Sequence, residues 1–209
     1  EGLSGKVGND RAQRMYLNAA YHCHEGEPLE RELLRIDVHE AGNSLEELDT
    51  LLNVDQKDFE QSCLNMLERV NQFYVQEVDD EAGHDTDPEF YIHLQGEEGF
   101  LRPSPEDPPY QIGIECKTTQ DLDSEIGVDD AMSVVTKANK ADIQITIGNP
   151  AFQDNAKAAA NSNGVLLLPA TALATLVTQI RENNYPVETI FELLETEGLV
   201  TRSDIQSML

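Results

Sequence analysis

The clearest pattern in the chain is an alternating run over residues 110–118. In an extended strand successive side chains point to opposite faces, so Ile112 and Ile114 share one face. Glu115 and Lys117 share the other face, and the glycine between the two isoleucines clears space there. The run therefore predicts a strand with its apolar face on a core and a carboxylate beside an ammonium on its polar face.

The segments around this run alternate between strand-like and helix-like patterns. Short apolar or alternating runs predict strands, and apolar residues three or four apart predict helices. The predicted strands cover 73–78, 90–94, 111–116, 143–147 and 165–168, and the predicted helices cover 56–70, 130–138, 152–160, 170–183 and 186–194. This order predicts an α/β fold with a mixed central sheet flanked by helices.

The first 53 residues read differently from the rest. Apolar spacing predicts helices over 11–23 and 30–38, and Ser44 opens a third with a capping box. We therefore divide the chain into a helical N-terminal extension, 1–53, and a main domain, 54–209. The extension is either the remnant of a recognition or linker domain or a packing extension.

A second acidic signal lies upstream of the first, in residues 83–89, just before the predicted strand at 90–94. It contains Asp85 and Asp87. If the strands at 90–94 and 111–116 are antiparallel neighbours, joined by the polar loop between them, carboxylates from both segments meet at one end of the sheet. The sequence therefore predicts that Asp87 and Glu115 lie at the same end of the sheet.

Two carboxylates and a lysine suit metal-assisted hydrolysis. Magnesium takes oxygen ligands and commonly only one or two protein carboxylates, with water and phosphate completing its shell. A neighbouring lysine can position or deprotonate a water and offset anionic charge. These residue types point to phosphodiester hydrolysis. The alternative from Glu115 and Lys117 alone is an exposed strand end with a surface ion pair.

The order of acid, strand and Glu-x-Lys resembles the PD-(D/E)xK nuclease superfamily. Asp87 matches the first acid, Glu115 the second and Lys117 the lysine, although the first motif reads Asp-Pro and not Pro-Asp. Asp85 competes for the first position. Asp87 is preferred because only two residues separate it from the apolar strand, as in that superfamily.

The resemblance implies a Mg²⁺ site and a division of roles. Asp87 and Glu115 are expected to hold the metal together with the backbone carbonyl of Cys116, and Lys117 is expected to position and activate the attacking water. In some members a helical glutamate adds a ligand, and Glu60 is the candidate here. Its alternative is a solvated surface glutamate.

Over residues 56–200 the order of elements is similar to the cleavage domains of FokI-like type IIS restriction enzymes. That subfamily commonly has Asp where this chain has Glu115, and both are hard oxygen ligands. The resemblance implies a magnesium-dependent DNA endonuclease of restriction or defence type, with a transient homodimer for double-strand cleavage. Two alternatives stay open: a catalytically silent interaction module of the same fold, and a resolvase or repair nuclease.

Composition bears on the setting of the protein. The chain carries 40 acidic and 14 basic residues, for a net charge of −26, whereas residues 131–181 carry four basic against two acidic residues. A general acidic excess with scarce lysine is typical of a protein adapted to high salt, where self-repulsion is screened. The three cysteines form no metal-ligand or disulfide pattern. No long apolar run or signal-peptide pattern occurs, so we expect a cytoplasmic protein without a membrane segment.

Overall fold

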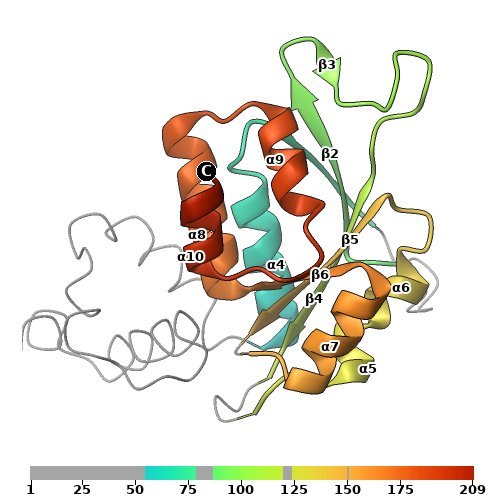
Figure 1. Cartoon of the computed structure of the whole chain (residues 1–209), viewed down its shortest axis with the longest axis vertical. Helices are drawn as coiled ribbons and strands as arrows, with labels where there is room; N and C mark the ends of the chain where they lie inside the picture. Colours follow the sequence, from blue (N-terminus) through green and yellow to red (C-terminus); the bar gives the residue numbers. More distant parts are fainter. Residues whose placement is uncertain (1–54, 79–86, 120–123, 150) are drawn as a thin grey trace, which may run out of the picture.

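The computed structural model describes residues 55–78, 87–119, 124–149 and 151–209, which are drawn in colour in Figure 1. The helices predicted within residues 1–53 and the acid candidate Asp85 lie outside the described residues. The described part forms one mixed sheet with helices on both of its faces (Figure 1). The predicted α/β class and the mixed central sheet are confirmed.

Seven strands make up the sheet in the described part of the chain. They are β1 (Phe73–Glu77), β2 (Phe90–Gly96), β3 (Gly99–Phe100), β4 (Ile112–Thr118), β5 (Ile143–Asn149), β6 (Val165–Pro169) and β7 (Gly198–Leu199). All five predicted strands are present. The two that the pattern missed, β3 and β7, are only two residues long and too short for an alternating signal.

The helices are α4 (Gln56–Leu67), α5 (Val128–Ala131), α6 (Ser133–Lys137), α7 (Asp154–Asn163), α8 (Ala170–Asn183), α9 (Val187–Leu194) and α10 (Arg202–Met208). Asp55 caps α4, because its side chain accepts a hydrogen bond from the backbone N–H of Asp58 at 3.0 Å. Among the described helices, none is long and apolar enough to cross a membrane.

The single helix predicted over 130–138 is divided into α5 and α6. The backbone leaves helical geometry at Met132, whose φ and ψ are −99° and 0°. Both pieces still dock on the sheet through the predicted apolar positions, since Ala131, Val134 and Ala138 are fully buried. The apolar spacing therefore identified the docked face correctly but not the break.

The strand order is β1-β2-β4-β5-β6-β7, with β3 paired to the outer end of β2. β1, β2 and β4 are antiparallel neighbours, and β4 to β7 are parallel. The antiparallel pairing of β2 with β4 was predicted, and its register matches Phe90 with Ile114. The next residues on these two strands, Glu89 and Glu115, are therefore brought opposite each other.

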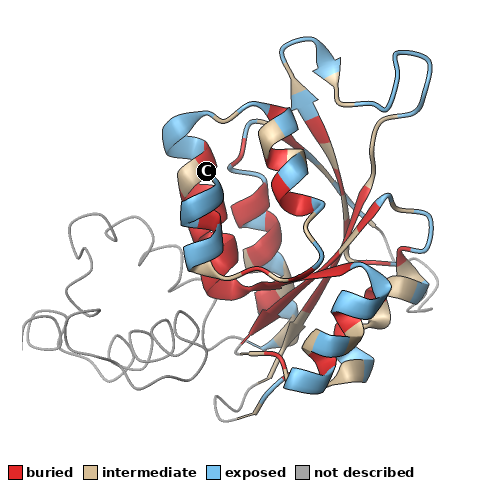
Figure 2. Ribbon diagram, in the orientation of Figure 1, coloured by how far each residue is buried: buried red, intermediate tan, exposed pale blue. Residues whose placement is uncertain are grey.

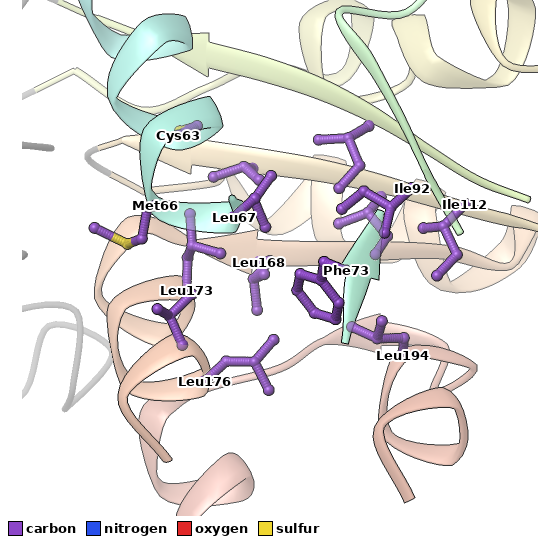
Figure 3. Packing of buried hydrophobic residues seen from close by; sticks show 14 of the residues in the cluster. Cys63, Met66, Leu67, Phe73, Ile92, Ile112, Leu168, Leu173, Leu176 and Leu194 are labelled. Carbon is purple, nitrogen blue, oxygen red and sulfur yellow. The ribbon is translucent and has the colours of Figure 1, made fainter. Parts of the chain in front are cut away.

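The larger core lies on the sheet face covered by α4, α8, α9 and α10 (Figure 1). Side chains from these helices interdigitate with the even-numbered residues of β2 and β4, as Figure 3 shows for Leu67, Leu173 and Ile112. Each such buried aliphatic side chain contributes roughly 1.5–3 kcal/mol relative to exposure. This face therefore anchors β4 in place.

The opposite face is covered by α5, α6 and α7, with α6 over β4 and β5 and α7 over β6 and β7. Alanines such as Ala138 and Ala156 lie there beside larger side chains such as Phe152. Figure 2 shows the central strands buried between the two helical layers and the β2–β3 end exposed. The candidate site lies on this second face, where α6 crosses β4.

Candidate active site

Strand β4 presents Glu115 and Lys117 on the face beneath α6. Glu115 is fully buried, and the side chain of Lys117 is 20% exposed. Nζ of Lys117 lies 2.6 Å from Oε1 of Glu115. The two residues predicted to lie side by side are thus in direct contact, although buried more deeply than a surface ion pair would be.

The glycine between the two isoleucines allows helix α6 to approach this strand closely. A methyl group on Gly113 would overlap the Cβ of Ala138, which follows α6. Two side chains of the neighbouring strand β5 also hold the segment that carries α6. Thr146 donates to the carbonyl of Ala131 at 2.8 Å, and Gln144 donates to the carbonyl of Ala138 at 3.0 Å. The polar face of β4 therefore lies directly under α6.

Helix α6 adds two side chains that the sequence analysis did not identify. Nζ of Lys137 donates to Oε1 of Glu115 at 2.7 Å. The hydroxyl of Ser133 lies 3.2 Å from the same oxygen and 2.8 Å from the carbonyl of Asp130, so its one proton is shared between these two acceptors. Ser133 and Lys137 are four residues apart, so they lie on one side of the helix. Their spacing was visible in the sequence, but nothing in it indicated that this side of the helix faces Glu115.

A second carboxyl group, that of Glu89, lies against Glu115. Its Oε2 accepts a hydrogen bond from the backbone N–H of Cys116 at 3.3 Å, and its carboxyl group hydrogen-bonds that of Glu115. Burial, followed by this hydrogen bond and the charge of Glu115, raises the pKa of Glu89 to about 9. Glu89 therefore carries a proton at neutral pH and shares it with Glu115.

The neighbours of Glu115 favour its ionised form. Burial alone would raise the pKa of Glu115, but hydrogen bonds from the Glu89 carboxyl and from the two lysines outweigh burial and lower it. Burial would lower the pKa of Lys117, whereas its hydrogen bond and charge interaction with Glu115 raise it. In the metal-free protein the centre is therefore a carboxylate with an ammonium and a neutral carboxylic acid.

Asp87, the first acid predicted from the sequence, is exposed at the start of β2. Its charge acts on Tyr91, whose pKa is raised first by burial and then by Asp87. The structure thus brings Glu89 against Glu115 and places Asp87 two residues further out. The sequence analysis missed Glu89 although it stands immediately before the strand.

The carbonyl of Cys116, predicted as a metal ligand, faces the start of helix α4. Nε2 of Gln56 donates to this carbonyl at 2.6 Å and to Oε1 of Glu60 at 2.6 Å, while Oε1 of Gln56 accepts from the N–H of Thr118 at 3.0 Å. Gln56 thereby bonds the backbone of β4 at Cys116 and Thr118, beyond the residues of β4 that pair with β2. Glu60 is connected to the site through Gln56, which the sequence analysis did not single out.

The residues present fit a hard divalent cation. Oε2 of Glu115 is buried and has no N–H or hydroxyl partner, and Glu89 lies beside the same carboxyl group. No group of three or more His, Cys, Asp or Glu side chains within the described residues is arranged as a metal site. Magnesium needs fewer, because one or two carboxylates suffice when water and substrate oxygens supply the rest.

Solved structures of known proteins are similar to this chain. The solved structure of the restriction endonuclease FokI is similar, with a TM-score of 0.54 at 10% sequence identity over 79% of this chain and 35% of FokI. The chain is also similar to AspBHI, a DNA modification-dependent restriction endonuclease (TM-score 0.38, 11% identity, 96% of this chain and 41% of AspBHI). A third neighbour is the restriction endonuclease MspJI, solved in complex with a 27-mer oligonucleotide (TM-score 0.42, 11% identity, 99% of this chain and 40% of MspJI).

Of the three likenesses, that to FokI has the highest TM-score and is the one that supports a restriction-endonuclease fold. The chain spans less than half the length of each of these proteins. A comparison with curated protein sequences finds no match. A family model does match, over residues 51–177, which is more than half of the chain and includes β1, β2, β4 and the candidate site. The chain therefore belongs to the Mrr_cat restriction endonuclease family.

Proposed function

We propose that this chain is a magnesium-dependent endonuclease that hydrolyses DNA phosphodiester bonds, as the cleavage domain of a restriction or defence enzyme. One observation carries the proposal: the buried carboxyl group of Glu115 and the half-buried one of Glu89 are in contact beside Lys117. Carboxyl groups buried together are costly unless a cation joins them. Their presence in a member of a restriction endonuclease family supports a metal-binding role.

Glu89 and Glu115 would hold Mg²⁺, with the carbonyl of Cys116 as a third oxygen. Glu89 is preferred over Asp87 because it contacts Glu115, whereas Asp87 is exposed and lies two residues before Glu89, ahead of β2. Glu60 would act at the edge of the site through Gln56, which already bonds both Glu60 and the Cys116 carbonyl.

The bound metal would supply Lewis acidity, which stabilises charge on the phosphate and lowers the pKa of a coordinated water. Lys117 would act as an ammonium, since its pKa is raised in the metal-free protein. In this form it donates hydrogen bonds, so it would orient the attacking water and offset the charge of the phosphate. Displacement of the Glu89 proton by the cation would accompany binding.

The direct test is cleavage of supercoiled plasmid DNA with magnesium chloride at high potassium chloride. We expect nicked and linear products with the wild-type chain, loss of cleavage with Lys117→Ala, and retention with Lys140→Ala, an exposed lysine that serves as the matched control. Wild-type rates in excess chelator would contradict the metal role. Absence of cleavage under every salt and metal condition would favour the catalytically silent interaction module.

The identity of the first acid needs its own pair of variants. If Glu89 is the ligand, Glu89→Gln abolishes cleavage and Asp87→Asn lowers it by less than tenfold. The reverse order would assign the first position to Asp87. Both variants replace a carboxyl group with an amide of nearly the same volume, so the comparison isolates the metal ligand from packing.

We also propose that the acidic composition is an adaptation to high salt. A net charge of −26 repels itself over a Debye length that grows from about 3 Å at 1 M salt to about 30 Å at 0.01 M. The melting temperature is expected to rise with potassium chloride up to molar concentrations. A melting temperature that does not change over that range would count against this adaptation.

Assembly is the remaining part of the proposal. One site of this kind cuts one strand, so a double-strand break requires two sites or two visits. A transient homodimer through residues 131–181, which carry little net charge, would make the rate of linear-DNA formation rise faster than linearly with protein concentration. Strict first-order dependence with nicked circles as the only product would favour a resolvase-like or nicking role.

A further inference from the structure

Two lysines donate to one oxygen of Glu115, and a serine hydroxyl shared with the carbonyl of Asp130 lies near it, while the other oxygen of Glu115 accepts from no N–H group. Nζ of Lys117, Nζ of Lys137 and the hydroxyl of Ser133 lie 2.6, 2.7 and 3.2 Å from Oε1. Oε2 is buried without such a partner. The two lysines therefore hold the carboxylate by Oε1, and the carboxyl group of Glu89 also bonds it.

The two lysines on this oxygen are held in different ways. Lys137 is only 8% exposed and belongs to α6, whose position is set by the close approach of the next residue, Ala138, to Gly113. Lys117 is 20% exposed and stands on β4, two residues from Glu115, on the less covered side of the site. Lys137 is thus anchored by the fold, whereas Lys117 has solvent on one side into which its ammonium can turn.

A buried carboxylate must keep a cationic partner, because an uncompensated charge in the interior is strongly unfavourable. If Lys117 were the only donor to Oε1, it could not turn toward a water or a phosphate without leaving this buried oxygen without a partner, even with a cation on Oε2. With Lys137 and Ser133 also on Oε1, Glu115 stays compensated when Lys117 leaves. With two lysines, Lys137 can compensate Glu115 while Lys117 acts on the substrate, which a single lysine could not do.

We propose that Lys137, assisted by Ser133, is a positioning residue that holds and neutralises Glu115 so that Lys117 is free to act at the scissile phosphate. The inference rests on the proposed nuclease function for its catalytic consequence. The electrostatic part of the inference is that either lysine alone can compensate the charge of Glu115, and it concerns the folded protein without substrate. The two parts are tested separately.

The first test is a double-mutant cycle on stability, measured by urea unfolding without metal or DNA. Lys117→Met and Lys137→Met each leave one lysine on Glu115, so each single variant should shift the urea midpoint only modestly. The double variant leaves the buried carboxylate without a cation and should lose more than the sum of the two single losses. Additive losses would overturn the redundancy of the two lysines. A double variant that does not fold, while both single variants fold, would support it.

The second test uses steady-state cleavage of plasmid DNA with saturating magnesium. Lys137→Met should lower kcat about 10- to 100-fold, in the range found for residues that orient metal ligands, with KM for DNA little changed. Lys137→Arg keeps the charge and should recover part of kcat, and Ser133→Ala should show a smaller fall in kcat. The exposed Lys140, changed to Met, is the matched control and should cleave normally.

Two kinetic outcomes would overturn the catalytic part. Lys137→Met with the wild-type kcat would show that Lys117 needs no help, and a loss confined to KM would show that Lys137 binds DNA directly. If the wild-type chain cleaves nothing, the proposed function fails, while the stability cycle still decides whether the two lysines share Glu115.

Discussion

The two faces of the sheet are built from different kinds of side chain. Under α4, α8, α9 and α10 the contacts are made by large aliphatic and aromatic residues, such as Leu173 and Phe73 (Figure 3). Under α5, α6 and α7 alanines accompany larger side chains such as Phe152, Gly113 and Gly148 allow close approaches, and the charged residues of the candidate site lie beside them. One face therefore provides most of the stability and the other provides the geometry of the site.

The physical reason is the distance between helix and strand. Large side chains fill the gap on the first face and hold the helices away from the backbone. On the second face a glycine in β4 and an alanine after α6 allow a close approach, so a serine and a lysine of α6 reach a strand carboxylate. The comparison predicts that damage to the first face lowers stability and damage to the second lowers activity.

The largest expected effect on stability is at Leu173, which is fully buried on the first face. Leu173→Ala should lower the free energy of unfolding by roughly 2–5 kcal/mol, because it removes buried apolar surface and leaves a cavity. Cleavage per folded molecule should be retained. Leu101→Ala, at a partly buried leucine beside the same core, is the control and should cost less in urea unfolding. Equal losses at both positions would contradict the difference in packing.

A smaller loss of stability with a larger loss of activity is expected for Gly113→Ala. The added methyl group meets the Cβ of Ala138, so the segment carrying α6 must shift, at a cost of about 1–3 kcal/mol. The shift would withdraw Ser133 and Lys137 from Glu115, and cleavage should fall at least tenfold. Gly127→Ala is the control, since no atom lies nearer than 3.8 Å to its added methyl group. Normal cleavage by the Gly113 variant would show that the close approach does not matter.

Glu89→Gln should stabilise the metal-free protein while abolishing cleavage. The pKa of Glu89 is about 9 in the folded state and near 4.5 when unfolded, so the folded state binds more protons between these values. Its contribution therefore favours folding below pH 4.5 and is lost as the pH rises toward 9. Glutamine mimics the protonated acid and removes this loss.

The gain in the free energy of unfolding from Glu89→Gln should grow with pH and reach roughly 1–2 kcal/mol near pH 8. This gain is smaller than the full pKa difference implies, because Lys117 and water partly compensate the charges of Glu89 and Glu115. Near pH 4.5 the variant and the wild type should be equally stable. The measurement is urea unfolding in chelator across this pH range. A destabilised variant at pH 8 would contradict the repulsion between the two carboxyl groups.

The smallest effect is expected on the uncovered part of the second face, beyond the edge of α6. Tyr74 is 52% exposed and makes an edge contact with Phe100, their ring centroids 5.5 Å apart. Tyr74→Ala should cost about 0.5–1 kcal/mol in urea unfolding and leave cleavage unchanged. Tyr74→Phe keeps the ring and should be neutral. A loss as large as that at Leu173 would show that this edge belongs to the core.

Local pattern was sufficient wherever neighbours in the sequence are neighbours in space. The alternation in β4 placed Glu115 and Lys117 on one face, because the side-chain period of a strand is two wherever the strand lies. The five long strands and the docked positions of the helices followed from the same periodicities. The same alternating run places a glycine at position 113 on the polar face, and α6 approaches the strand closely at that glycine.

The partners of Glu115 were decided by the tertiary structure. Lys137 is 22 residues away and Ser133 is 18, and Gln56 reaches the same strand edge from 60 residues upstream. Each is an ordinary polar residue of a helix in the sequence, and only the docking of that helix gives it a target. Glu89 became a partner through the register of β2 on β4, and a slip of one residue would have turned its side chain to the other face. The sequence by itself thus determined the strand and its two catalytic candidates, whereas strand register and helix docking, set by packing over long separations, decided which other groups surround them.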